Sequence, residues 1–149
     1  FMTCYDVYFN EQIEHIAKGN ADIILIPGYQ RGERTDIICA QAKLTAFRCN
    51  AYVARSSYSM DSDENGGCSM IVAPDGKIIK NIGKDVGSIS ADIEPFEKYM
   101  RSAGYGEGLV KNNDFISDFY VVAFSEHQHV LTRSCQLFPV SVHSLCFVI

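Results

Sequence analysis

Cys4 is the residue of this sequence that is best placed for covalent chemistry. It ends a short apolar run, and the polar residues from Asn10 onward predict the start of a helix. In α/β proteins ligands bind beyond the carboxyl ends of strands, and a nucleophile on a sharp turn there stays exposed beside backbone N–H groups that can hold an oxyanion. A nearby helix N-terminus also favours the thiolate. The competing interpretation is a small buried apolar residue, the commonest fate of a free cysteine.

The remaining cysteines and the histidines predict neither disulfides nor a metal site. The six cysteines are irregularly spaced and form no C-x-x-C pair, which is typical of a reduced, cytoplasmic protein. Zinc is the alternative near the C-terminus, but structural zinc sites use closely paired ligands and this group offers only a loose His-x-His. We therefore predict no metal and no cofactor. The C-terminal group consists of His127, His129, Cys135 and His143.

The composition indicates a globular protein. Its 149 residues are 47% hydrophobic and 21% charged, and this length suffices for a substantial core. The net charge of -5 argues against a nucleic-acid partner, which would require a basic surface. No apolar run approaches the roughly 20 residues that cross a bilayer, so we expect no membrane partner either.

Periodicity and turn residues predict an α/β chain with a mixed sheet that helices cover on one face. Strands that helices connect should be parallel, whereas the turn Pro74-Asp75-Gly76 predicts an antiparallel hairpin. Asn10 and Thr35 are the expected helix caps. The continuous apolar run 21–27 predicts a strand buried on both faces. The expected elements are a strand ending at Cys4, helices over 11–18 and 35–49, strands over 21–27, 51–57 and 87–93, a hairpin over 68–82, and a short helix from Pro95.

Five stretches occur in the order and spacing of the carbon–nitrogen hydrolase (nitrilase/amidase) superfamily, which the chain resembles over roughly residues 1 to 94. The resemblance is to the C-terminal half of that domain, so it implies half of an α-β-β-α sandwich. We expect residues 1–124 to form this part and 125–149 to form an atypical apolar tail, either an edge strand or a partner-binding segment. The five stretches are CYDVYFNE, ADIILIPG, AFRCNAYVARSS, GGCSMIVAPDGKII and GSISADIE.

The resemblance also implies an activity. In this superfamily a cysteine thiolate attacks an amide, carbamoyl or nitrile carbon, and water hydrolyses the covalent intermediate. A glutamate moves protons and a lysine stabilises developing negative charge. Cys4 matches the nucleophile, and the backbone N–H of Tyr5 matches an oxyanion contact. The glutamate and lysine belong to the N-terminal half, so we expect this chain to be an inactive fragment of a hydrolase. The full-length protein is then expected to be a homo-oligomer that acts on a small-molecule amide or nitrile.

The loop after Pro27 matches the segment that sets substrate specificity in the superfamily. Its arginines can clamp a substrate carboxylate through paired hydrogen bonds, although solvated loop charges are the simpler interpretation. The candidate substrate-binding residues are Tyr29, Arg31, Glu33 and Arg34.

Two alternative interpretations remain at this stage. The chain departs from the superfamily pattern at Asn10, where a proline is usual, and over 45–49, where two charged residues are lost. A nitrilase-like module that no longer catalyses and serves in protein interaction is therefore the alternative function. A complete flavodoxin-like binding domain is the third interpretation, but no glycine-rich phosphate loop follows any strand.

Overall fold

The computed structural model describes residues 1–102, 108–112 and 144–148, the last of these by their backbone. Helices α1 and α2 and the strands of the main sheet follow each other along the first 81 residues, as the sequence predicts. The elements are η1 (Cys4–Tyr8), α1 (Asn10–Lys18), β1 (Ile23–Gly28), α2 (Thr35–Cys49), β2 (Tyr52–Ser57), β3 (Met70–Val72), β4 (Ile78–Asn81), β5 (Ser88–Asp92), β6 (Met100–Ser102), β7 (Leu109–Lys111) and β8 (Ser144–Val148).

The main sheet has the strand order β1-β2-β3-β4. Strand β1 is parallel to β2, with Ile23 opposite Tyr52, because α2 carries the chain back across the sheet between them. Strands β3 and β4 are antiparallel neighbours joined by the predicted turn, where Gly76 has a φ of +82°. The predicted mixed sheet is confirmed. The four-layer sandwich stays a prediction.

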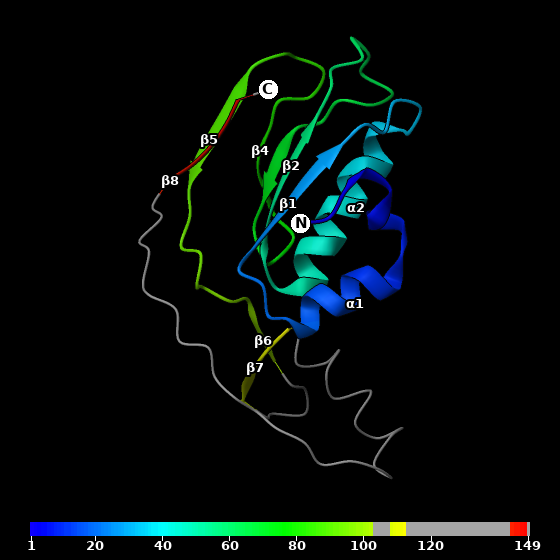
Figure 1. Ribbon diagram of the computed structural model, residues 1–149. Helices are drawn as coiled ribbons and strands as arrows, with labels where there is room; N and C mark the ends of the chain where they lie inside the picture. The colour runs from blue at the N-terminus through cyan, green and yellow to red at the C-terminus, as the bar shows by residue number, and fades with distance from the viewer. Residues whose placement is uncertain (103–107, 113–143, 149) are drawn as a thin grey trace.

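Both helices cover the same face of this sheet (Figure 1). Apolar residues recur every three or four positions on each helix, so each presents one stripe to the sheet. On α2 this stripe is Ile38, Ala42, Ala46 and Cys49, each at most 2% exposed. It packs with Ile24 and Ile26 of β1 and with Val53, Met70 and Val72 of the next two strands.

One polar contact between α1 and α2 joins two positions at which the sequence departs from the superfamily pattern. Arg48 donates a hydrogen bond to Asn10 Oδ1 over 2.8 Å, and its guanidinium lies 3.8 Å from the Glu14 carboxylate. The substituted residues therefore contact each other. The helix pair keeps a polar link on its outer side.

The opposite face of the sheet packs against β5, which runs beside it in Figure 1. Tyr52 and Ile71 of the sheet are buried together with Ala91 and Ile93. Strand β5 also pairs antiparallel with β8, and this pair forms a separate two-stranded sheet. Of the expected tail 125–149, only β8 lies within the described residues.

The structure corrects five local expectations. Residues 1–3 are not a strand: Met2 makes one backbone hydrogen bond to Leu25, and the turn at Cys4 then leads the chain away. Helix α1 begins at Asn10 itself, after Phe9, so Asn10 is not its cap. Strand β1 alternates between fully and partly buried residues, because only one of its faces meets the helices.

The other two corrections concern Thr35 and Pro95. Thr35 is the first residue of α2 and its hydroxyl donates to the Asp63 carbonyl, while Arg34 occupies the cap position. Residues 95–102 contain no helix, and a single turn closes there from the Glu97 N–H to the Glu94 carbonyl. The Lys98 ammonium then binds the Ala21 carbonyl, and this anchor draws the chain along the edge of the sheet.

Candidate active site

Cys4 occupies a strained turn at the carboxyl end of β1. Its φ of +43° lies in the left-handed region, which a residue with a Cβ adopts at a cost of roughly 1–2 kcal/mol. Asp6 stabilises the turn, because its backbone N–H donates to the Thr3 carbonyl over 2.8 Å and its carboxylate accepts from the Thr3 N–H over 2.7 Å. Strain of this kind at a reactive residue is typical of a nucleophile held on a sharp turn. Cys4 is half-buried, so its thiol is neither sealed in the core nor fully in solvent.

The Cys4 thiol faces the end of β1. The Tyr29 backbone N–H points to Cys4 Sγ at 3.4 Å, and this contact joins η1 to the first residue beyond β1. Tyr5 follows Cys4 directly in η1, and its side chain is 64% exposed. The role of its N–H as an oxyanion donor stays a prediction.

Aromatic rings surround this turn. The Tyr5 ring lies 4.9 Å from the Tyr8 ring, and Tyr29 lies 5.0 Å from Tyr58, edge to face, measured between ring centroids. All four side chains are more than 40% exposed. The Arg31 guanidinium lies 5.2 Å from the centre of the Tyr29 ring, a cation–π distance. An apolar or aromatic group that approaches Cys4 would therefore meet tyrosine faces and one cation.

A polar network lies beneath these rings and was not predicted from the sequence. The Tyr8 hydroxyl donates to the Glu33 carboxylate over 2.5 Å and accepts from Gln30 Nε2 over 3.1 Å. Gln30 is 8% exposed and also donates to Gln41 Oε1 on α2 over 2.9 Å. Glu33 is thus held toward η1, whereas the sequence suggested a substrate contact. Its proposed binding role is not tested by this geometry.

Arg55 of β2 anchors the network from below. It is 4% exposed, and its guanidinium donates to Gln30 Oε1 and to the carbonyls of Gly67 and Cys68 over 2.7 to 3.0 Å. Burial lowers the pKa of Arg55, because desolvation disfavours its charge. The signal was present in the sequence: a charged residue inside the apolar strand 52–57 must find partners. The partners themselves come from segments far apart along the chain.

The predicted arginines differ in their surroundings. Arg31 is exposed and its guanidinium lies over the Tyr29 ring. Arg34 instead forms a two-bond ion pair with Asp36 at 2.5 and 3.0 Å, in which both side chains are more than half exposed. Arg31 therefore contacts an aromatic ring, whereas Arg34 is paired with a carboxylate of α2.

Two further findings bear on the kind of site. Within residues 1–102 and 108–112, no three histidine, cysteine, aspartate or glutamate side chains are grouped to hold a metal ion. The histidine and cysteine group of the C-terminal segment lies outside the described residues. No helix in the described part of the chain is long and apolar enough to cross a membrane.

Comparison with known proteins gives consistent matches. The family profile of the carbon–nitrogen hydrolases matches residues 1–97. A curated relative from Pseudomonas protegens, described as a hydrolase in the pqqF 5′ region, is 29% identical over 96 residues, which are 63% of this chain and 34% of that protein. The chain thus spans about a third of the length of this relative.

Solved structures in the nitrilase superfamily are also similar. A mutant of an amidase from Nesterenkonia AN1 is 23% identical, with a TM-score of 0.48, over 56% of this chain and 32% of the amidase. Saccharomyces cerevisiae Nit3, a member of branch 10 of the nitrilase superfamily, is 19% identical, with a TM-score of 0.45, over 85% of this chain and 41% of that protein.

Proposed function

Because the chain belongs to the carbon–nitrogen hydrolase family, we propose that it supplies the nucleophile for hydrolysis of a non-peptide amide, carbamoyl or nitrile compound. The observation that carries this proposal is the conformation of Cys4. A strained, half-buried thiol stands where the carboxyl ends of two parallel strands meet, and a backbone N–H is directed at its sulfur. This is the arrangement that covalent catalysis requires of a nucleophile.

For an amide, the reaction proceeds by acyl transfer. The Cys4 sulfur forms a bond to the carbonyl carbon, and the carbonyl electrons move to oxygen, for which the Tyr5 N–H is the proposed hydrogen-bond donor. When the carbonyl re-forms, the C–N bond breaks and the nitrogen takes a proton and leaves as an amine or ammonia. Water then attacks the thioester, which releases the acid and restores the Cys4 thiol.

Proton transfer in these steps needs a base, and a cation is needed to support the developing charge. The Glu33 carboxylate accepts hydrogen bonds from the Tyr8 hydroxyl of η1 and from the Arg34 backbone N–H. We propose that the general base and the lysine come from a longer polypeptide, since this chain spans about a third of its curated relative. The isolated chain should then acylate but not turn over. We propose that the whole protein is cytoplasmic and homo-oligomeric.

The surroundings of Cys4 support a narrower substrate class. Arg31 stacks on Tyr29, and Tyr29 packs against Tyr58. We propose that this surface binds an amide that carries a carboxylate, and that the carboxylate pairs with the Arg31 guanidinium.

A single-turnover assay tests the role of Cys4 without needing the missing groups. The chain, kept reduced with a phosphine, is mixed with p-nitrophenyl acetate, and p-nitrophenol release and the intact mass are followed. We expect a burst of about one equivalent and an acetyl adduct that maps to Cys4. The burst should vanish in Cys4→Ala and persist in Cys39→Ala, the matched control.

A second arm of the experiment supplies the N-terminal half of a related hydrolase by co-expression. Ammonia release from a panel of simple amides should then appear and should depend on Cys4. An adduct that forms equally on other cysteines, or a burst that survives Cys4→Ala, would contradict the nucleophile assignment. A burst without turnover in the completed protein would instead favour the interaction module.

A further inference from the structure

Two further thiols, those of Cys39 and Cys68, lie near Arg55 and away from the turn at Cys4 in the sequence. Cys39 comes from the start of α2 and Cys68 from the loop that precedes β3. Both line one pocket of about 270 Å³, and the Cys68 side chain is near enough to raise the pKa of the Cys39 thiol. A disulfide needs two cysteines brought together in this way from distant segments.

The pocket gives a small oxidant access to this pair. Cys39 is half-buried at the pocket, whereas Cys68, which also lines the pocket, is only 3% exposed. By contrast, Cys49 is 0% exposed and its thiol points to the Ile13 carbonyl at 3.5 Å inside the helix interface. Among the described cysteines, Cys39 is therefore an accessible thiol with Cys68 as its partner. Cys49 is a fully buried thiol that serves as an internal control.

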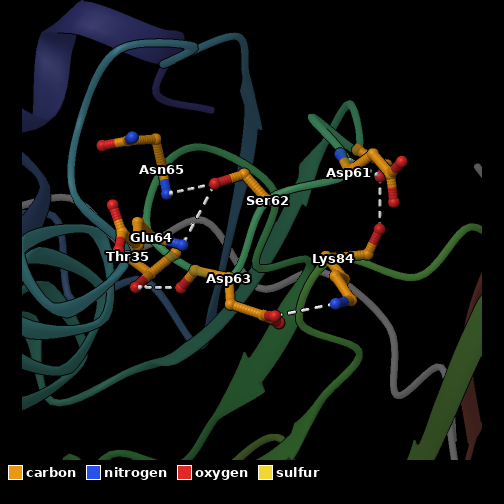
Figure 2. Close-up of polar contacts among 8 residues, drawn as sticks. Thr35, Asp61, Ser62, Asp63, Glu64, Asn65 and Lys84 are labelled. Carbon is orange, nitrogen blue, oxygen red and sulfur yellow. Dashed lines mark hydrogen bonds and ion pairs between the residues drawn. The ribbon is translucent and has the colours of Figure 1, made fainter.

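The loop 59–66 forms one wall of the pocket and is fastened in place (Figure 2). Asp63 binds the Lys84 ammonium over 2.7 Å, and its carbonyl accepts a hydrogen bond from Thr35 at the start of α2. The Ser59 hydroxyl donates to the Lys84 carbonyl. These contacts hold the loop against both α2 and the segment after β4, so they fix the segments that line the pocket.

Two polar groups lie beside the pair. Asn81 Nδ2 donates to Cys39 Sγ at 3.6 Å. Arg55 donates to the Cys68 carbonyl at 3.0 Å, and its buried positive charge acts on both sulfurs. Burial and the neighbouring Cys68 thiol raise the pKa of Cys39, and Arg55 and Asn81 offset only part of that rise. A cation that lacks a carboxylate partner among the described residues stabilises any thiolate that forms here.

We propose that Cys39 and Cys68 form a reversible oxidation site that closes to an intramolecular disulfide with hydrogen peroxide as the oxidant. The Cys39 thiolate attacks one peroxide oxygen, the O–O bond breaks, and a sulfenic acid and hydroxide form. The Cys68 thiolate then attacks that sulfur, the S–O bond breaks, and a second hydroxide leaves as water. Two thiols and one peroxide thus give one disulfide and two waters. This site does not rest on the proposed function.

Peptide mapping of the whole reduced chain tests the proposal. The protein is treated with hydrogen peroxide, blocked with N-ethylmaleimide, unfolded, digested with trypsin and analysed by mass spectrometry. We expect the peptides 35–43 and 56–77 to appear joined, about 2 Da lighter than their sum, and to separate on reduction. Cys49 should remain free and become alkylated only after unfolding.

Variants make the outcome specific. Cys4→Ala should leave the 39–68 link intact, which separates this site from the nucleophile. In Cys68→Ser the linked peptide should be lost and Cys39 should instead accumulate as a sulfenic acid that dimedone traps. The proposal is overturned if peroxide leaves both thiols alkylatable while it oxidises Cys4. It is equally overturned if Cys39 or Cys68 is recovered joined to another cysteine.

Discussion

Gly67, the residue before Cys68, offers the sharpest test of the backbone geometry around the pocket that Cys39 and Cys68 line. Gly67 has a φ of +59°, and a Cβ built on it would lie 2.7 Å from the Gly83 carbonyl oxygen. That oxygen accepts the Cys68 N–H over 2.7 Å, so it cannot move away without stretching a hydrogen bond. Gly67→Ala therefore combines left-handed strain of about 1–2 kcal/mol with roughly 1 kcal/mol for the weakened bond. We expect a loss of about 2–3 kcal/mol in the free energy of unfolding.

Two other glycines separate these causes. Gly83 has a φ of +67° but no atom within 4 Å of a built Cβ, so Gly83→Ala should cost only the strain of about 1–2 kcal/mol. Gly32 has neither a positive φ nor a neighbour within 4 Å. Gly32→Ala should be neutral, or stabilising by up to about 1 kcal/mol through the unfolded chain.

Urea unfolding followed by far-ultraviolet circular dichroism measures the series. The expected order of destabilisation is Gly67→Ala, then Gly83→Ala, then Gly32→Ala, with similar slopes against urea. A Gly67→Ala variant that is no less stable than Gly83→Ala would show that the close approach to the Gly83 carbonyl does not exist in solution.

The remaining predictions concern charge. Burial raises the pKa of Cys49 to about 11 from an ordinary 9.0. The neutral thiol is thus favoured in the folded state, and up to roughly 3 kcal/mol of stability should be lost as the pH rises from 9 to 11. Cys49→Ala should lack that part of the pH dependence in urea titrations under reduction. In the protein completed with an N-terminal half, Arg31→Ala should raise the KM for carboxylate-bearing amides about tenfold. Arg34→Ala should change this KM less than about twofold, because its guanidinium is already paired with Asp36. Equal effects of the two variants in steady-state assays would refute the assignment of Arg31 to the substrate carboxylate.

Local signals in the sequence account for most of the elements near Cys4. The helix over 35–49 and the Pro74-Asp75-Gly76 turn depend on a few neighbouring residues, and both formed where they were predicted. The apolar run before Pro27 also gave a strand, although not one buried on both faces. The turn at Cys4 was expected as the end of a strand, which residues 1–3 do not form. Where a distant contact competes with a local preference, the prediction failed. Pro95 is the example, since the anchor of Lys98 decides the path that follows it.

The polar partners near the site could not be predicted in the same way. The buried charge of Arg55 was visible in the sequence, but Gln30 and the carbonyls at 67 and 68 reach it only after the strands have paired. The contact between Cys39 and Cys68 likewise depends on how α2 rests on the sheet. Hydrogen-bond partners of this kind are set by tertiary geometry, which residue types and spacing do not encode locally.

The pairing of β5 with β8 has a consequence for the order of folding. Ile23 pairs with Tyr52 in the main sheet, while Ser88 pairs with Val148, a separation about twice as long. Doubling a loop costs only about 0.6 kcal/mol of closure entropy, so the equilibrium hardly distinguishes the two pairings. The search time for distant contacts does distinguish them, because folding slows as the sequence separation grows. We expect the four-stranded sheet to assemble first. The β5 edge then stays open during that interval, when another chain can pair with it in place of β8.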